Sequence, residues 1–150
     1  MSEHLKTEID FDTISWHDNH VHALRVIEGE DGSGELVLDI DHIVEWIETP
    51  DGAFQFRILP VTLTFHGVMF LRLALDYASA TAAFTPFMIE GIERQVEQRN
   101  GFATHHWTIP ISWPSGSLAF EARGFTQCGD GEPIHTTSQC LTPEQRRREA

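Results

Sequence analysis

Histidine and acidic residues are concentrated in the first third of this chain, in the segments HDNHVH (residues 17–22) and DIDH (residues 39–42). Imidazole and carboxylate groups are ligands for metal ions and are also common general acids and bases. Residues 1–51 contain five of the nine histidines and 14 of the 23 acidic residues, but only two basic residues, Lys6 and Arg25. This segment therefore carries −12 (2 − 14) of the chain's charge of −13. We expect such a surface to attract a positive species, either a metal ion or a basic protein.

The elements that must position these residues are the two strands of a hairpin. Residues 20–27 and 35–47 alternate apolar and polar side chains, and the glycine-rich segment 29–34 between them is typical of a turn. A turn centred in that segment pairs Leu24 with Leu38. A shift by one residue would bring an aspartate to the buried face, so the pattern favours this register.

This register predicts three imidazoles on one face at one end of the hairpin. His20 faces His42, and His22 follows His20 on the same side of its strand. The three rings could share one Zn²⁺ or Fe²⁺, with a carboxylate from Asp18 or Glu45, and such a site could activate water or bind oxygen. The competing interpretation is structural, with the histidines hydrogen-bonded to the backbone at the sheet margin. No cofactor is expected unless these histidines bind Zn²⁺ or Fe²⁺.

The carboxylates of the same segment are expected on the opposite face of the hairpin. Asp39, Asp41 and Glu45 are separated by even numbers of positions, so they share one face of the second strand. Asp18 lies in a turn before the first strand. We interpret these four residues as candidate contacts for a basic partner. The alternatives are that Asp39 and Asp41 act as an acid–base pair, or that this face is only solvated.

Several classes of function lack the residues that they need. Phosphate binding requires clustered Lys or Arg, and such a cluster occurs only at residues 146–148, so no nucleic-acid partner is expected. The sequence contains neither the GxxxxGK nor the GxGxxG nucleotide-binding pattern, and no GxSxG nucleophile motif. Cys128 and Cys140 are expected to be free thiols in a reducing compartment.

The rest of the chain repeats the two-residue period of the hairpin. Apolar residues alternate with polar ones over residues 61–66, 71–77, 107–113 and 118–123, and Asn100-Gly101 is a strong signal for a tight hairpin turn. These patterns predict an all-β protein, a single antiparallel β-sandwich or barrel-like domain of about eight strands.

The length predicts one domain, residues 1–150, with residues 1–10 and 143–150 at its periphery. Pro143 predicts a short helical turn near the C-terminus. Residues 86–98 fit both a strand and a helix, and the hairpin turn that follows them favours the strand. Pro60 interrupts a strand-like run and predicts a bulge or a sheet edge.

The sequence has no apolar run approaching the roughly 18 residues that a membrane span needs. Its first residues, MSEHLKTEIDFD, contain no apolar leader. We therefore expect no membrane contact and a cytoplasmic location.

The segments SWHDN (residues 15–19), LDIDHIVEW (38–46) and GFTQ (124–127) resemble a group of small, uncharacterised bacterial proteins. The resemblance covers most of the chain and implies a compact, mostly β domain, without an assigned reaction or catalytic residues. In size and charge the chain is also similar to small acidic immunity proteins of bacterial toxin systems.

Three hypotheses of function follow from the sequence. The favoured one is a non-enzymatic binding domain whose acidic N-terminal hairpins contact a basic protein. The second is a metal-binding domain or metal-dependent enzyme that uses the three histidines. The third is a small-molecule-binding barrel with a pocket lined by Trp107, Trp113 and phenylalanines.

Overall fold

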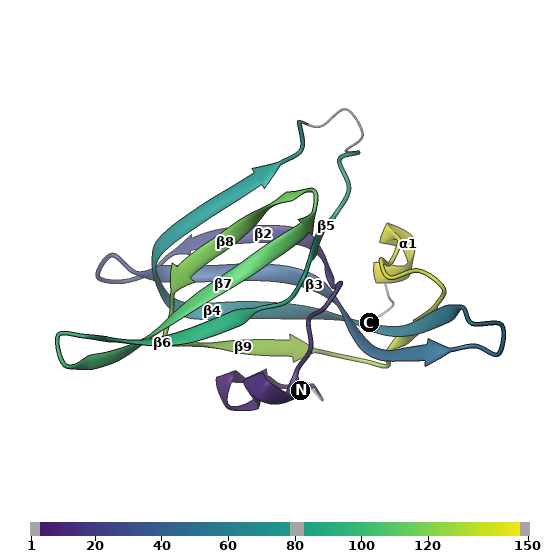
Figure 1. Cartoon of the computed structure of the whole chain (residues 1–150), viewed down its shortest axis with the longest axis horizontal. Helices are drawn as coiled ribbons and strands as arrows, with labels where there is room; N and C mark the ends of the chain where they lie inside the picture. The colour runs from purple at the N-terminus through teal and green to yellow at the C-terminus, as the bar shows by residue number, and fades with distance from the viewer. Residues whose placement is uncertain (1–3, 79–82, 148–150) are drawn as a thin grey trace.

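The computed structural model of the chain describes residues 4–78 and 83–147 (Figure 1). Parts of the two predicted peripheral ends, residues 1–3 and 148–150, lie outside the described residues. The elements, in chain order, are β1 (Lys6–Thr7), the 3₁₀ helix η1 (Glu8–Thr13), β2 (His20–Glu28), β3 (Gly34–Glu48), β4 (Phe54–Asp76), β5 (Phe87–Ile89), β6 (Glu93–Arg99), β7 (Phe102–Trp113), β8 (Ser115–Glu121), β9 (Gly124–Gly129), β10 (Ile134–Thr136) and α1 (Pro143–Arg146).

The ten strands of the described residues belong to one antiparallel sheet that closes on itself. The strand order is β1-β9-β4-β3-β2-β5-β7-β6, while β8 pairs with both β4 and β7, and β10 pairs with β4. Since β8 links β7 back to β4, the strands β4, β3, β2, β5, β7 and β8 form a ring (Figure 1). The predicted all-β, antiparallel fold is therefore confirmed.

The strands differ in number and length from those expected. The long β4 unites the runs 61–66 and 71–77, which the alternation suggested as separate strands, and β1, β9 and β10 add short strands. Residues 86–98 do form strands, β5 and β6, with a break at residues 90–92. Asn100 and Gly101 form the predicted tight turn, both with positive φ (52° and 81°).

Pro60 lies inside β4, at a local edge. On the side away from β3, β10 pairs with β4 as far as Ile58, and β9 pairs with it from Val61 onward. The N–H that proline lacks is therefore not needed by a neighbour on that side, which is the condition under which a strand tolerates proline.

The ring encloses an aromatic and aliphatic core. Alternation along β4 turns Val61, Leu63 and Phe65 inward, at 3%, 0% and 0% exposure. Phe65 packs edge-on against Trp107 at 5.2 Å between ring centroids. The largest fully buried side chains are Trp107, Phe65, Phe120, Phe125, Leu36, Leu38, Ile40, Ile58, Leu59, Leu63, Ile89 and Ile109.

The two tryptophans expected to line a ligand pocket occupy different environments. Trp107 is fully buried among phenylalanines of the core. Trp113, at the far end of β7, is 43% exposed. In the described part of the chain, no helix has the length and apolar character required to cross a membrane.

Candidate functional site

A β-bulge in β2 decides which face the N-terminal histidines occupy. The predicted pairing with β3 holds from the turn as far as Ala23, which lies opposite Asp39. His22 then falls in the bulge, and the register shifts so that His20 lies opposite Asp41 instead of His42. The prediction that the three histidines share one face is therefore wrong. His20 and His22 lie on the outer face with the aspartates, while His42 stays on the core side of β3.

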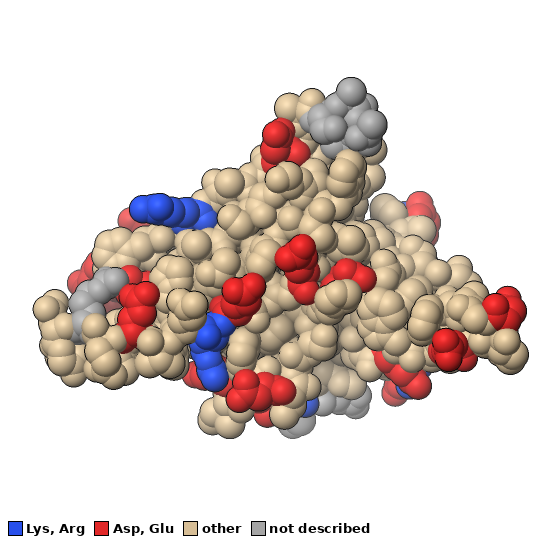
Figure 2. Space-filling model, in the orientation of Figure 1, with Lys and Arg blue, Asp and Glu red and all other residues tan. Residues whose placement is uncertain are grey.

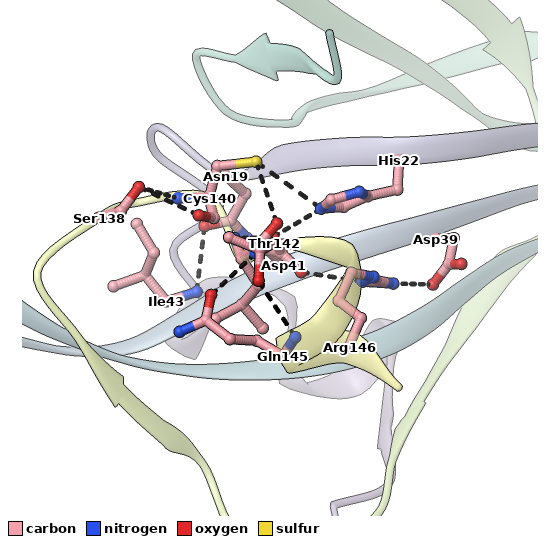
Figure 3. Close-up of polar contacts among 11 residues, drawn as sticks. Asn19, His22, Asp39, Asp41, Ile43, Ser138, Cys140, Thr142, Gln145 and Arg146 are labelled. Atoms are coloured by element: carbon pink, nitrogen blue, oxygen red, sulfur yellow. Dashed lines mark hydrogen bonds and ion pairs between the residues drawn. The ribbon is translucent and has the colours of Figure 1, made fainter. Parts of the chain in front are cut away.

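Asp41 is the centre of a buried polar cluster on this outer face (Figure 3). Its side chain is 0% exposed and accepts three hydrogen bonds. Oδ2 accepts from His22 Nε2 and from the backbone N–H of Leu141, both at 2.7 Å, and Oδ1 accepts from Arg146 Nη1 at 2.9 Å. A buried carboxylate requires such partners, because desolvation without compensation costs several kcal/mol. We call Asp41, His22, Cys140, Leu141 and Arg146 the Asp41 centre.

The C-terminal segment is held next to Asp41 by the buried side chain of Leu141. Leu141 is 2% exposed and belongs to a small second apolar cluster beside the main core. That cluster also contains Ile43, Phe56, Ile58 and Ile134. Burial of Leu141 thus places its own N–H and the neighbouring Cys140 over β3.

A capping box then starts the helical turn α1, from which the side chain of Arg146 extends toward β3. Thr142 Oγ1 accepts from the N–H of Gln145, and Gln145 Oε1 accepts from the N–H of Thr142. Arg146 binds Asp41 through Nη1 and Asp39 through Nη2, the latter at 2.6 Å. The guanidinium therefore joins two carboxylates of β3, and its side chain is 14% exposed.

Cys140 completes this cluster as a neutral thiol. Its Sγ lies 3.8 Å from His22 Nε2 and 3.7 Å from the carbonyl oxygen of Leu141. Burial, and secondly the negative charge of Asp41, raise the pKa of Cys140 to about 11. Since the nucleophilic form of cysteine is the thiolate, this group without a metal is not an activated nucleophile. Neither Cys140 nor Cys128 forms a disulfide.

His20 lies beside the Asp41 centre. Burial lowers the pKa of His20 below its usual value, although the nearby Asp41 opposes this shift. Its Nδ1 is buried and has no hydrogen-bond partner among the described residues. The face next to Asp41 therefore carries an imidazole nitrogen whose hydrogen-bonding capacity is unused.

His42 has a separate, structural environment on the core side of β3. Asn19, which is 0% exposed, donates from Nδ2 to His42 Nδ1 at 2.8 Å. The Oδ1 of Asn19 accepts from the N–H of Ile43 at 3.3 Å. Burial lowers the pKa of His42 to about 4, so its ring is neutral and accepts this bond at neutral pH. The structure does not bring His42 together with His20 and His22.

Each of the four predicted partner contacts has a polar partner within the chain. Asp41 and Asp39 bind Arg146, as described above. Glu45 lies 3.3 Å from Arg57 Nη1, and Asp18 accepts a hydrogen bond from Gln139 at 3.4 Å. Three of these charges, those of Asp39, Asp41 and Glu45, are therefore partly neutralised by arginines of the same chain.

Other carboxylates remain exposed, at the turn between β2 and β3. Glu28, Glu30 and Asp31 are exposed, and none of the three forms an ion pair within residues 4–78 and 83–147. Figure 2 shows that acidic side chains are spread over the visible face, whereas Lys and Arg are few.

Apolar side chains lie directly beside these carboxylates. Val26 and Phe70 are 65% and 64% exposed, and they line one groove together with Glu28 and Met69. An adjoining groove contains Glu30, Asp31, Met69 and Arg123. The six residues that we call the tip surface are Val26, Glu28, Glu30, Asp31, Met69 and Phe70.

Cys140 and Arg146 were not indicated as site residues by the sequence pattern. Cys140 contacts His22 across 118 positions of chain, and Arg146 contacts Asp41 across 105. The only related feature in the sequence analysis was the helical turn expected at Pro143. It predicts where a helix begins, but not that Cys140 or Arg146 contacts His22 or Asp41. A scan against protein-family models finds no match for this chain, and a search of curated proteins finds no significant relative. The resemblance to small bacterial proteins stays a prediction.

Proposed function

We propose that this protein is a non-enzymatic binding domain, and that its tip surface contacts a basic polypeptide segment of another protein. The observation that carries the proposal is a group of exposed carboxylates, Glu28, Glu30 and Asp31, that form no ion pair among the described residues and lie next to exposed apolar side chains.

The charge and the apolar area of the tip surface support binding in two different ways. Opposite charge steers a partner toward the site and raises the association rate, in a way that added salt suppresses. Exposed apolar groups such as Val26 and Phe70 supply the area that desolvates on contact. A partner that carries Lys or Arg beside an apolar residue fits both features.

The backbone of β2 supports an extended segment as the binding form. Beyond Val21, β2 pairs with β3 on one side, and in the described part of the chain no strand pairs with its other side. An open strand edge can accept a further strand from a partner, and the main-chain hydrogen bonds then add affinity. The free thiols of Cys128 and Cys140 fit a reducing compartment such as the cytoplasm, which we propose as the location.

The experiment is a selection of random peptides displayed on phage, with the wild-type protein immobilised. We expect enrichment of peptides that combine Lys or Arg with an apolar residue. Binding of a synthetic peptide from this pool should weaken at least tenfold in the triple variant Glu28→Gln/Glu30→Gln/Asp31→Asn, and it should weaken as salt is raised.

A matched control removes the same number of charges elsewhere. The variant Glu48→Gln/Glu90→Gln/Glu93→Gln alters three exposed acidic residues outside the tip surface and has the same net charge as the test variant. It should bind the peptide like the wild type. No enrichment of basic peptides, or equal weakening in both triple variants, would overturn the proposal.

A further inference from the structure

The described residues contain a group of three different metal-ligand types gathered from three distant parts of the chain. His22 Nε2, an Asp41 carboxylate oxygen and Cys140 Sγ all lie within 4.8 Å of one another. We propose that these three residues bind a divalent transition-metal ion, with Zn²⁺ as the best match. The site differs from the three-histidine set suggested by the sequence, and it is independent of the tip surface.

The distances between the ligand atoms suit one small cation. His22 Nε2 is 2.7 Å from Asp41 Oδ2 and 3.8 Å from Cys140 Sγ. In a tetrahedral zinc site with bonds of 2.0 to 2.3 Å, ligand atoms lie roughly 3.4 Å apart. The three atoms therefore need to move by less than about 1 Å to reach this geometry.

The donor types also match zinc. Sulfur, imidazole nitrogen and carboxylate oxygen are its usual protein ligands, and a fourth position stays available to water or another side chain. His20 is the cross-strand neighbour of Asp41, and its buried Nδ1 has no hydrogen-bond partner among the described residues. The His20 imidazole therefore adds a further potential ligand atom, Nδ1, to the same face.

The surroundings hold the ligands in place and balance their charge. Arg146 and the N–H of Leu141 fix the orientation of Asp41, as groups around a metal site commonly do for its ligands. A thiolate and a carboxylate together neutralise one Zn²⁺. The neighbouring positive charge of Arg146 is balanced by Asp39.

The proton balance of binding is simple. The S–H bond of Cys140 breaks, an S–Zn bond forms, and the proton passes to bulk water. His22 gives up the proton that Nε2 donates to Asp41 and takes one up on Nδ1, by exchange with bulk water, so that Nε2 can bind the ion. Its hydrogen bond to Asp41 is then replaced by shared coordination of the ion. The metal would then join the C-terminal segment to β2 and β3, from which His22 and Asp41 come.

The test is a titration of the full chain, purified without an affinity tag, with Co²⁺ and then with Zn²⁺. We expect one equivalent of Co²⁺ to produce the intense near-ultraviolet absorption of a cobalt–thiolate bond, and Zn²⁺ to displace it. Cys140→Ser should remove this absorption and weaken Zn²⁺ binding by more than about 100-fold, because a lost ligand costs more than a lost outer contact. Cys128→Ser and His42→Gln should retain both.

A second measurement uses the wild-type protein and does not depend on the folding of a variant. Zn²⁺ should slow alkylation of Cys140 relative to that of Cys128, as followed by mass spectrometry of the two peptides. Absence of the cobalt–thiolate absorption in the wild type would overturn the proposal. Its persistence in Cys140→Ser, or equal alkylation of Cys140 with and without Zn²⁺, would do the same.

Discussion

The Asp41 centre and the tip surface both take their carboxylates from the acidic first third of the chain, yet these carboxylates lie in opposite environments. Asp41 is fully buried and accepts three hydrogen bonds, one of them from Arg146. Glu28, Glu30 and Asp31 are exposed and form no ion pair within the described residues. Acidic charge therefore contributes to the fold at one place and remains available to a partner at the other.

The difference teaches that charge counted along a sequence does not show which charges are available. A buried carboxylate must be compensated inside the protein, and removal of its partner leaves an uncompensated charge. An exposed carboxylate is already solvated, so its removal changes stability little. The following four predictions test this contrast, beginning with the largest effect.

Replacement of Arg146 should have the largest effect on stability. Arg146→Met leaves Asp41 buried without its cation, and we expect the free energy of unfolding to fall by about 3 to 5 kcal/mol. Chemical denaturation followed by tryptophan fluorescence measures this change.

The control for Arg146 lies on the same helical turn. Arg147 is 71% exposed at its side chain, and it pairs only loosely with Glu144 at 3.6 Å. Arg147→Met should change stability by less than about 0.5 kcal/mol. Equal effects of the two variants would show that the Asp41 centre does not stabilise the fold.

His42 should make the fold sensitive to mild acid. Its pKa is lowered to about 4 in the folded protein, so below pH 6.5 the unfolded chain binds a proton that the folded chain does not. The contribution of His42 to the free energy of unfolding is complete above pH 6.5 and is lost as the pH falls toward 4. The loss is about 2 kcal/mol at pH 5 and reaches about 3 kcal/mol.

The comparison for His42 is the variant His42→Gln, measured from pH 7.5 to pH 4 in the presence of a chelator. The variant should lose less stability across this range than the wild type, because glutamine does not titrate. Parallel curves for the two proteins would contradict a buried, neutral His42.

The ion pair between Glu45 and Arg57 should contribute little. Both side chains are more than 40% exposed, and their closest atoms are 3.3 Å apart. We expect Glu45→Gln to lower stability by about 0.2 to 1 kcal/mol at low salt, and by less at high salt, where the attraction is screened. Denaturation curves at two salt concentrations test this, and a cost above about 2 kcal/mol would refute the assignment of Glu45 as an exposed pair.

The tip surface should have the smallest effect on stability. The triple variant Glu28→Gln/Glu30→Gln/Asp31→Asn should change the free energy of unfolding by less than about 0.5 kcal/mol, because the three carboxylates that it removes are exposed and form no ion pair with the described residues. Thermal unfolding of this variant and of Glu48→Gln/Glu90→Gln/Glu93→Gln should give closely similar midpoints. A large loss of stability in the tip variant alone would show that these residues support the fold instead of a binding surface.

Much of the fold could be predicted because it depends on neighbours in sequence. Alternation of side chains indicated the strands, and the glycine-rich segment 29–34 and the pair Asn100-Gly101 marked hairpin turns. The pairing of Leu24 with Leu38 followed from keeping apolar residues on one face. The candidate site was harder to predict from the sequence. A bulge changes the face of every residue beyond it, yet it leaves the alternating pattern of side chains almost unchanged.

The sequence by itself thus determined that this chain is all-β, where its main hairpins turn, and that its first third is acidic. Tertiary structure alone decided that His22 turns toward Asp41, that Cys140 and Arg146 join them from the C-terminal segment, and that Glu28, Glu30 and Asp31 stay exposed. The physical reason is that strand and turn preferences act between close neighbours, whereas burial and ion pairing depend on which distant segments the closed sheet brings together.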